Sequence, residues 1–215
     1  MEKESRLQRG DGKATREKLL QCAVHLAAKK GFASVTSKEI CEMAGTNLAA
    51  VNYHFGSREG LHQEMLLMIH QHFLSEDFLQ SLEVLDASPK KRLELFCDEL
   101  IKRLGSGEEW LIKVWLREIL SGSPDVKVAL QKIAFMKGYR LIHLFQDYTG
   151  LAKDDVRLYS SIISFVAPFL MTAIGRQSPL QYEEITHCTF EEQSWWQGLK
   201  TFAFAGLNAV SVKKH

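Results

Sequence analysis

Histidine side chains are the first candidates for chemistry in this sequence of 215 residues. His62, His70 and His72 fall in one helical pattern, at spacings of eight and two residues. A zinc site on a single helix favours two ligands four residues apart on one face, as in H-E-x-x-H. These histidines lack that spacing, so we expect solvated side chains, no bound metal and no cofactor.

The sequence also lacks the motifs that would identify a catalytic centre. It contains no G-x-S-x-G, no P-loop and no dinucleotide-binding glycine pattern. Cys22, Cys41 and Cys97 fall inside helical patterns, where a free thiol is usually a small buried hydrophobe, and Cys188 has no C-x-x-C partner. Because no catalytic motif is found, we expect a protein that is not an enzyme. The N-terminal residues are polar and charged, unlike a signal peptide, so we expect it in the reducing cytoplasm.

A short helical pattern over residues 47–55 carries a different kind of candidate surface. At 100° per residue, Leu48, Val51 and Phe55 define its buried side. Small residues on the other side would let the helix enter a DNA major groove about 12 Å wide, and polar ones could bond base edges or phosphates. The alternative is a surface of good helix formers with no partner. The residues on this side are Thr46, Asn47, Ala49, Ala50, Tyr53 and His54.

The residues around this pattern predict the helices that must position it. A first helix from Thr15 ends where Gly31 can take the left-handed conformation. Thr36 and Glu39 form a capping box for a short second helix, which stops at Gly45. Two short helices joined by a glycine-containing turn and braced by a longer helix are typical of a helix-turn-helix.

The rest of the sequence is helical as well. The 3.6-residue period continues in patterns separated by Gly, Ser and Pro, and no segment alternates as a strand would. We therefore predict an all-α fold of about nine helices. It has a flexible N-terminal arm at residues 1–13, a three-helix helix-turn-helix DNA-binding domain at 14–60, and a further helical domain at 61–215. The patterns after residue 57 span residues 58–74, 89–104, 108–120, 125–148, 154–174 and 191–210.

One of these patterns must be compared with a membrane span. Residues 158–175 contain no charge over 18 residues, the length at which a transmembrane helix becomes conceivable. The segment nevertheless includes three serines, a threonine and Pro168, and Arg157 and Arg176 flank it. A helix buried in a bundle explains this composition better than a membrane span.

Over about residues 13–61 the sequence resembles the N-terminal domain of the TetR family of transcriptional regulators. The resemblance lies in Gly31-Phe32, in T-S-K-E-I-C-E-M-A-G and in N-L-A-A-V-N-Y-H-F-G-S-R-E-G-L. These segments combine a glycine, a capped short helix, an Ala-Gly turn and an aromatic-His-Phe ending followed by Ser-Arg-Glu. Beyond them the chain is similar to the family in the number, length and order of its helices, and R-E-I-L-S-G-S-P weakly resembles the CecR-type subgroup.

The resemblance implies a set of DNA contacts. Residues at the start of the second helix, the end of the third and the first turn of the fourth would contact phosphates. Asn52 stands where many family members have Tyr, and the 100° projection places it nearer the buried side. Its role stays open between a base contact, a phosphate contact and a cap. The implied phosphate contacts are Ser37, Tyr53, His54 and Arg58, and the implied base-facing residues are Asn47, Ala49 and Ala50.

The resemblance further implies that residues 61–215 form a helical ligand-binding and dimerisation domain. In it the last two long helices pair with their copies in a dimer, and a small-molecule pocket precedes them. Apolar stripes agree with an interface, although an intramolecular core would give the same stripes. The predicted dimerisation residues are Tyr159, Ile162, Val166, Leu170, Leu199, Phe202, Gly206 and Ala209.

Large apolar side chains on inward-looking positions agree with a pocket, although core packing would give them too. Of Arg117 and Glu118, which interrupt an apolar helix, we expect one to face inward and to need a partner, either a ligand or an intramolecular salt bridge. The predicted ligand-binding residues are Met65, Met68, Trp110, Trp115, Arg117, Phe135, Met136, Tyr139 and Phe165.

The charge distribution agrees with DNA binding by the N-terminal part. Residues 1–60 contain ten Lys/Arg and seven Asp/Glu, whereas residues 61–215 contain seventeen and nineteen. A mildly basic region favours a polyanion, although many other proteins have one. We therefore expect a repressor that binds a near-palindromic double-stranded DNA operator as a homodimer and is released by a mostly apolar effector. The alternative, a helical protein-interaction adaptor, leaves the small and polar side of residues 46–54 unexplained.

Overall fold

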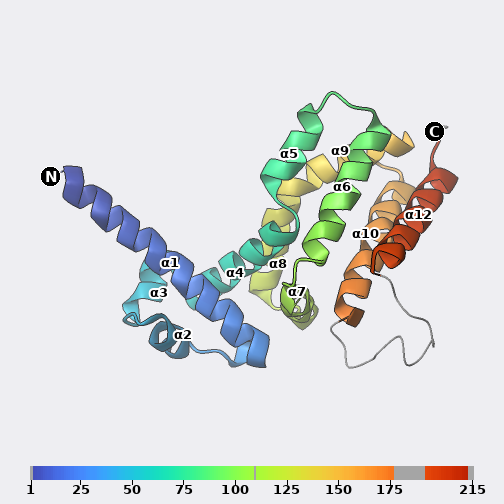
Figure 1. The fold of residues 1–215 in the computed structure, drawn as a ribbon. Coiled ribbons are helices and arrows are strands. Elements are labelled where there is room, and N and C mark those ends of the chain that lie inside the picture. Colours follow the sequence, from blue (N-terminus) through green and yellow to red (C-terminus); the bar gives the residue numbers. More distant parts are fainter. Residues whose placement is uncertain (1, 109, 177–191, 213–215) are drawn as a thin grey trace. The chain divides into compact units, whose positions relative to one another are not determined.

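The structure, a computed structural model, describes residues 2–108, 110–176 and 192–212. Over these ranges the chain is helical and contains no strand, as the sequence predicts (Figure 1). It divides into two compact units, one with residues 1–70 and 113–132 and the other with residues 71–112 and 133–215. The predicted boundary at residue 60 differs from this division because residues 113–132 pack with the N-terminal helices.

Unit 1 contains the predicted helix-turn-helix. Its first helix begins at Glu2, whereas the sequence predicts a start at Thr15 after a flexible arm. Residues 2–14 are rich in Glu, Lys, Arg and Gln and contain no Pro, so their composition permits a helix. The elements of unit 1 are α1 (Glu2–Lys30), the short 3₁₀ helix η1 (Phe32–Ser34), α2 (Ser37–Ala44), α3 (Ala49–Phe55), most of α4 (Arg58–Phe73), and parts of α7 (Trp110–Ser121) and α8 (Pro124–Ile133).

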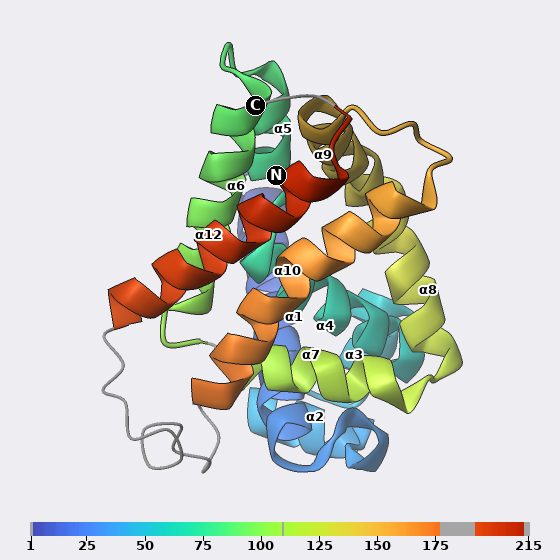
Figure 2. The same cartoon turned by 90° about the vertical axis from the view of Figure 1, so that its right-hand side faces the viewer.

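Unit 2 is a helical bundle around buried aromatic rings. Its helix α5 (Glu76–Val84), which the sequence analysis missed, is capped by the Ser75 hydroxyl and buries Leu79 and Leu82. The predicted helix over residues 125–148 is interrupted by a π-helical turn, η2 (Ala134–Gly138). Two long helices, α10 and α12, pack against each other (Figure 2). The remaining elements are α6 (Pro89–Leu104), α9 (Tyr139–Thr149), α10 (Val156–Arg176) and α12 (Glu192–Val210).

Candidate nucleic-acid interface

Helix α2 is fixed at both ends by local contacts. The Glu39 amide donates to the Thr36 hydroxyl at 3.2 Å and the Thr36 amide donates to the Glu39 carboxylate at 2.9 Å, which is the predicted capping box. Lys30 lies 2.6 Å from the Glu39 carboxylate, and this bond, with those from Thr36, lowers the pKa of Glu39 to about 2. Gly45, with a φ of 67°, ends the helix in the left-handed conformation.

Helix α3 begins at Ala49, two residues later than predicted. The Ala50 amide donates to Asn47 Oδ1 at 3.1 Å, so this side chain caps the start of the helix. Val51 is buried as predicted, but Leu48, predicted to be buried, is 58% exposed. Because Asn47 and Ala49 are exposed as well, the residues that lead into α3 lie outside the core, and the buried side of the helix begins with Val51.

Most of the predicted DNA-contacting residues lie on accessible surface of α2 and α3. Tyr53 is 84% exposed and Ala49 is also exposed. Asn52, predicted nearer the buried side, is exposed, and its side-chain amide makes no hydrogen bond to the part of the chain that the structure describes. The half-buried members of the set are Ser37, Ala50, His54 and Arg58.

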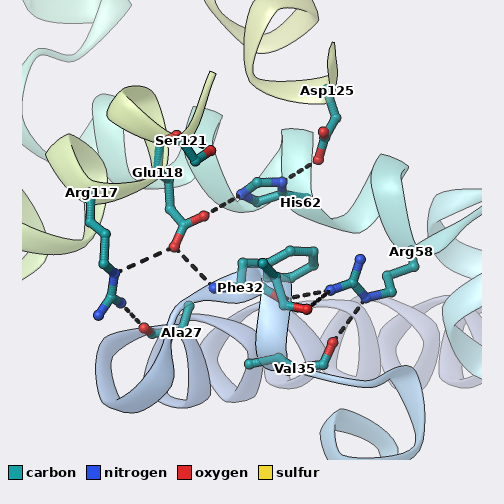
Figure 3. A network of polar contacts seen from close by, with 10 residues as sticks. Ala27, Phe32, Val35, Arg58, His62, Arg117, Glu118, Ser121 and Asp125 are labelled. Carbon is teal, nitrogen blue, oxygen red and sulfur yellow. Dashed lines mark hydrogen bonds and ion pairs between the residues drawn. The ribbon is translucent and has the colours of Figure 1, made fainter. Parts of the chain in front are cut away.

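Arg58 directs its guanidinium to the turn between α1 and α2, whereas the sequence predicts a phosphate contact. Its Nε donates to the Val35 carbonyl at 2.9 Å and its Nη2 to the Phe32 carbonyl at 2.5 Å (Figure 3). The guanidinium carbon lies 4.5 Å from the centre of the Phe32 ring. Arg58 therefore braces the turn that places α2.

We expect Arg58→Ala to lower the free energy of unfolding by about 2 kcal/mol, because hydrogen bonds to a charged group contribute about 1.5–3 kcal/mol. Arg58→Lys should recover only part of this loss, since an ammonium cannot reproduce the guanidinium fork. Urea denaturation followed by circular dichroism measures both variants. Unchanged stability, combined with a slope of log affinity against log salt that falls by about one unit, would show instead that Arg58 serves only a phosphate.

A buried carboxylate joins residues 113–132 to the same turn. The Phe32 amide donates to Glu118 Oε1 at 3.0 Å, and Glu118 Oε2 lies 3.2 Å from His62 Nε2 (Figure 3). Burial acts to raise the pKa of Glu118, but the contacts with His62 and Phe32 outweigh it, so this pKa lies below its ordinary value. The sequence predicts that one of Arg117 and Glu118 faces inward, and in the structure that residue is Glu118.

His62 lies between two carboxylates and is only 3% exposed, so the prediction of solvated histidines is wrong for it. Its Nδ1 contacts the Asp125 carboxylate on α8 while its Nε2 faces Glu118. The imidazole stacks on the Phe32 ring with centroids 4.0 Å apart. The available sequence signal was the apolar period of α4, since the buried Leu66 and Ile69 follow His62 by four and seven residues.

Arg117 adds a contact at the end of α1. Its guanidinium donates to the Ala27 carbonyl, one of the last carbonyls of that helix, which lack partners inside it. Together with Glu118 and His62, this contact holds α7 and α8 against the turn that leads into α2 (Figure 3). The position of the helix-turn-helix thus depends on residues far along the chain.

Comparison with known proteins assigns this arrangement to a family. The family model described as bacterial regulatory proteins, tetR family, matches residues 19–65, which include α2, α3 and the turn between them. Residues 19–65 are therefore similar to the helix-turn-helix domain of the TetR family of transcriptional regulators. It is 25% identical over 180 residues to the HTH-type transcriptional dual regulator CecR of Shigella flexneri, a match that covers 79% of this chain and 80% of the relative.

Solved structures share the fold along most of the chain. A transcriptional regulator from Pseudomonas aeruginosa PAO1 matches with a TM-score of 0.66 at 16% identity, covering 90% of each chain. NalD, the secondary repressor of the MexAB-OprM multidrug efflux pump in Pseudomonas aeruginosa, matches with a TM-score of 0.61 at 19% identity, covering 91% of this chain and 96% of NalD. The all-helical TetR fold predicted from the sequence is confirmed.

The predicted dimerisation residues differ in exposure. Phe202 is 74% exposed, Tyr159 is 41% exposed, and Gly206 and Ala209 are exposed too. Helices α10 and α12 also expose apolar residues that the prediction omitted, namely Val156, Ile163, Met171 and Trp195. The half-buried members of the predicted set are Ile162, Val166, Leu170 and Leu199.

The predicted ligand-binding residues of unit 2 do not share one environment. Phe135 is 89% exposed, and Met136 and Tyr139 are exposed as well, so the expectation that these three point inward is wrong. They lie in or beside the π-helical turn, where one extra residue per turn shifts side chains off the regular helical period. Phe165 is buried among aromatic rings, 5.3 Å from Phe145 between centroids. Trp110 is partly exposed.

The predicted ligand-binding residues of unit 1 do not line either of the two cavities described below. Met65 is fully buried, Met68 and Trp115 are half-buried, and Arg117 is committed to Ala27. Two cavities of unit 2 are lined by other residues. One, of about 340 Å³, lies between α5 and α6, and one of about 170 Å³ also adjoins α9. The first is lined by Phe78, Ser81, Leu82, Leu85, Leu95, Asp98, Glu99 and Lys102.

Histidine, cysteine and carboxylate side chains do not gather into a metal site anywhere among the described residues. Cys22, Cys41 and Cys97 are free and buried, as predicted, and burial raises the pKa of the Cys97 thiol to about 12. Cys188 lies outside the described residues.

Proposed function

We propose that this TetR-family regulator is a cytoplasmic repressor that binds a near-palindromic operator as a homodimer and releases it when a mostly apolar small molecule binds. The observation that carries the proposal is the exposed face of α3, which is small at Ala49 and polar at Asn52 and Tyr53. A helix with this face fits a major groove about 12 Å wide. The capped α2 and the buried Glu118 contacts hold the helix rigidly enough to present it.

Within this proposal, phosphate and base contacts come from different residues. Ser37, Tyr53 and His54 contact phosphates, which fix the register of the protein on the duplex. Asn47 faces a base with its Nδ2 donor while its Oδ1 accepts from the Ala50 amide. Ala49 and Ala50 let the helix backbone approach the base edges.

We expect Tyr53→Ala to weaken binding to specific and non-specific DNA by the same factor, because a phosphate contact carries no sequence information. Fluorescence anisotropy with the selected operator and with a scrambled duplex measures both affinities. Tyr139→Ala, which removes an exposed tyrosine from α9, is the matched control and should bind both duplexes as the wild type does. A loss restricted to the operator would instead assign Tyr53 to a base.

A homodimer follows from the apolar residues that α10 and α12 expose. Ile163 and Met171 on α10 and Phe202 on α12 are each more than half exposed in the single chain. A two-fold interface would cover these stripes with their own copies, as in a four-helix arrangement. The dimer would also supply two recognition helices for two half-sites about 34–36 Å apart.

The apolar character of α10 also meets the length and composition of a membrane span. The window Val156–Gly175 has a mean hydropathy of 1.7, and 33% of it is buried inside the structure. Leu158, Phe165 and Phe169 on its inner side are fully buried. A dimer interface on the outer side accounts for the apolar residues that remain, so we favour a second copy over a lipid environment.

The proposed effector site lies between α5 and α6. The cavity there has about 340 Å³, within the usual range of about 300–1,000 Å³ for ligand sites. Phe78, Leu82, Leu85 and Leu95 make it mostly apolar, with charged side chains such as Lys102 among its lining. This composition favours an apolar molecule with one polar group. NalD, whose fold this chain shares, is likewise a repressor, of a multidrug efflux pump.

Selection of bound sequences from a random DNA pool, followed by light scattering of the complex, tests the proposal. The expected result is an enriched near-palindrome bound by one dimer. Effectors are then found as compounds that raise the thermal midpoint of the free protein and lower operator affinity, by about 5–150-fold for a coupling of about 1–3 kcal/mol. A ligand with equal affinity for the free and operator-bound protein is not an effector. Recovery of no common sequence would overturn the operator proposal.

A further inference from the structure

The first two turns of the recognition helix α3 expose an apolar and an amide side chain side by side. Leu48 is 58% exposed and has helical backbone angles, with a φ of −62° and a ψ of −26°. Asn52 follows four residues later and is exposed as well. Helical residues four apart are neighbours on one face, with Cβ atoms about 5–6 Å apart. Neither residue is explained by the folding of unit 1, because neither side chain is buried in it.

The chemistry of these two side chains matches one base pair of the major groove. The thymine C5 methyl group is the apolar group that base edges present there, and an apolar side chain recognises it by contact. Adenine presents an acceptor at N7 and a donor at N6, which an asparagine amide satisfies in a bidentate pair. Asn52 has both its amide groups available for this, since it makes no side-chain hydrogen bond within the described residues.

Asn47, the other asparagine on this surface, does not suit the same task. Its Oδ1 accepts from the Ala50 amide at 3.1 Å, which holds this side chain against the start of α3. A bidentate adenine pair needs a donor and an acceptor from the same amide. Because no backbone bond holds the Asn52 amide within the described residues, it can turn both groups toward one adenine, which distinguishes it from Asn47.

We propose that Leu48 and Asn52 together specify A·T pairs in the operator half-site, with Leu48 on a thymine methyl group and Asn52 on adenine. This inference rests on the proposed operator binding and names the bases that the same surface recognises. Leu48 is a specificity residue that the sequence pattern assigned to the core. A contact with thymine accounts for an apolar side chain that is exposed on a DNA-facing helix.

Atom-level changes in the operator test the inference. Replacing one thymine at a time by deoxyuridine removes a single methyl group, and one position per half-site should weaken wild-type binding about fourfold, as expected for one buried methyl group. Leu48→Ala should bind the thymine and deoxyuridine operators equally at that position. Leu48→Met, which keeps an apolar side chain, should retain part of the preference. Met43→Ala, a matched exposed residue on α2, should retain all of it.

Adenine is tested in the same way with 7-deazaadenine, which lacks the N7 acceptor. Wild-type binding should fall at least about fivefold at one position, and Asn52→Ala should lose this sensitivity, since a full bidentate pair discriminates by about 5–150-fold. Both variants change exposed residues, so their circular dichroism and thermal midpoints should match the wild type.

The outcomes separate two failures. A protein that selects an operator yet ignores every deoxyuridine and deazaadenine substitution would overturn this inference alone. Unaltered sensitivity of Leu48→Ala and Asn52→Ala to those substitutions would overturn it as well. A protein that binds all DNA sequences equally would overturn the operator proposal and this inference together.

Discussion

Glu118→Ala is expected to lower the free energy of unfolding by about 3–5 kcal/mol, the usual cost of removing one partner from a buried charged pair. The carboxylate is 5% exposed and accepts from the Phe32 amide while it contacts His62. Its removal leaves both groups buried without that partner. A loss of this size is a large part of the total stability of a typical domain, about 5–15 kcal/mol. Urea unfolding followed by circular dichroism measures it.

Two further variants make the Glu118 result specific. Glu17→Ala removes a carboxylate that is 59% exposed and lies 3.9 Å from Lys13, and should change stability by less than about 0.5 kcal/mol. Glu118→Gln keeps an acceptor for the Phe32 amide but loses the charge beside His62, so its loss should be intermediate. Equal losses for Glu118→Ala and Glu17→Ala would show that the buried contacts do not hold the turn.

The pH dependence of this difference has a defined sign. The pKa of Glu118 lies below its ordinary value of 4.5, so the ionised carboxylate stabilises the folded state fully above that pH. The stabilisation is lost as the pH falls through the lower folded-state pKa. The difference in unfolding free energy between the wild type and Glu118→Gln should therefore shrink as the pH is lowered below 4.5.

Local signals in the sequence predicted the local structure of the helix-turn-helix. The structure contains the capping box of Thr36 and Glu39 and the left-handed Gly45. Both could be predicted because each feature depends only on residues within about one helical turn of it. The apolar period of the third helix predicted the burial of Val51 for the same reason. The missed helix α5 had its own local signal in the capping Ser75.

The contacts that hold the helix-turn-helix could not be predicted in this way. His62 and Asp125 are separated by 63 residues, and Phe32 and Glu118 by 86 residues. A helical pattern shows that one of Arg117 and Glu118 must turn inward, but it does not name a partner from another helix. The prediction that Leu48 is buried was wrong for a different reason. The periodicity of α3 does not show where along the helix axis the core ends.

Phe202→Glu is the second change for which we expect a large effect. Phe202 is 74% exposed on α12, and Gly206 and Ala209 on the same face would let a second helix approach closely. In a two-fold interface this substitution buries two unpaired carboxylates, one from each subunit. The loss of a central aromatic residue alone costs about 2–4 kcal/mol of association free energy. The dissociation constant of the dimer should therefore rise at least about 30-fold.

The measurement is sedimentation equilibrium of the free protein, paired with affinity for an operator that carries two half-sites. Operator affinity should fall with dimerisation, while affinity for a single half-site should stay at the wild-type value, because α3 is unchanged. Val84→Glu is the control, since Val84 is 77% exposed at the end of α5 and away from the proposed interface. A Phe202→Glu protein that remains a dimer would place the interface on another surface. A loss of half-site affinity as large as the loss of operator affinity would mean that the substitution acts on the folding of the chain and not on its pairing.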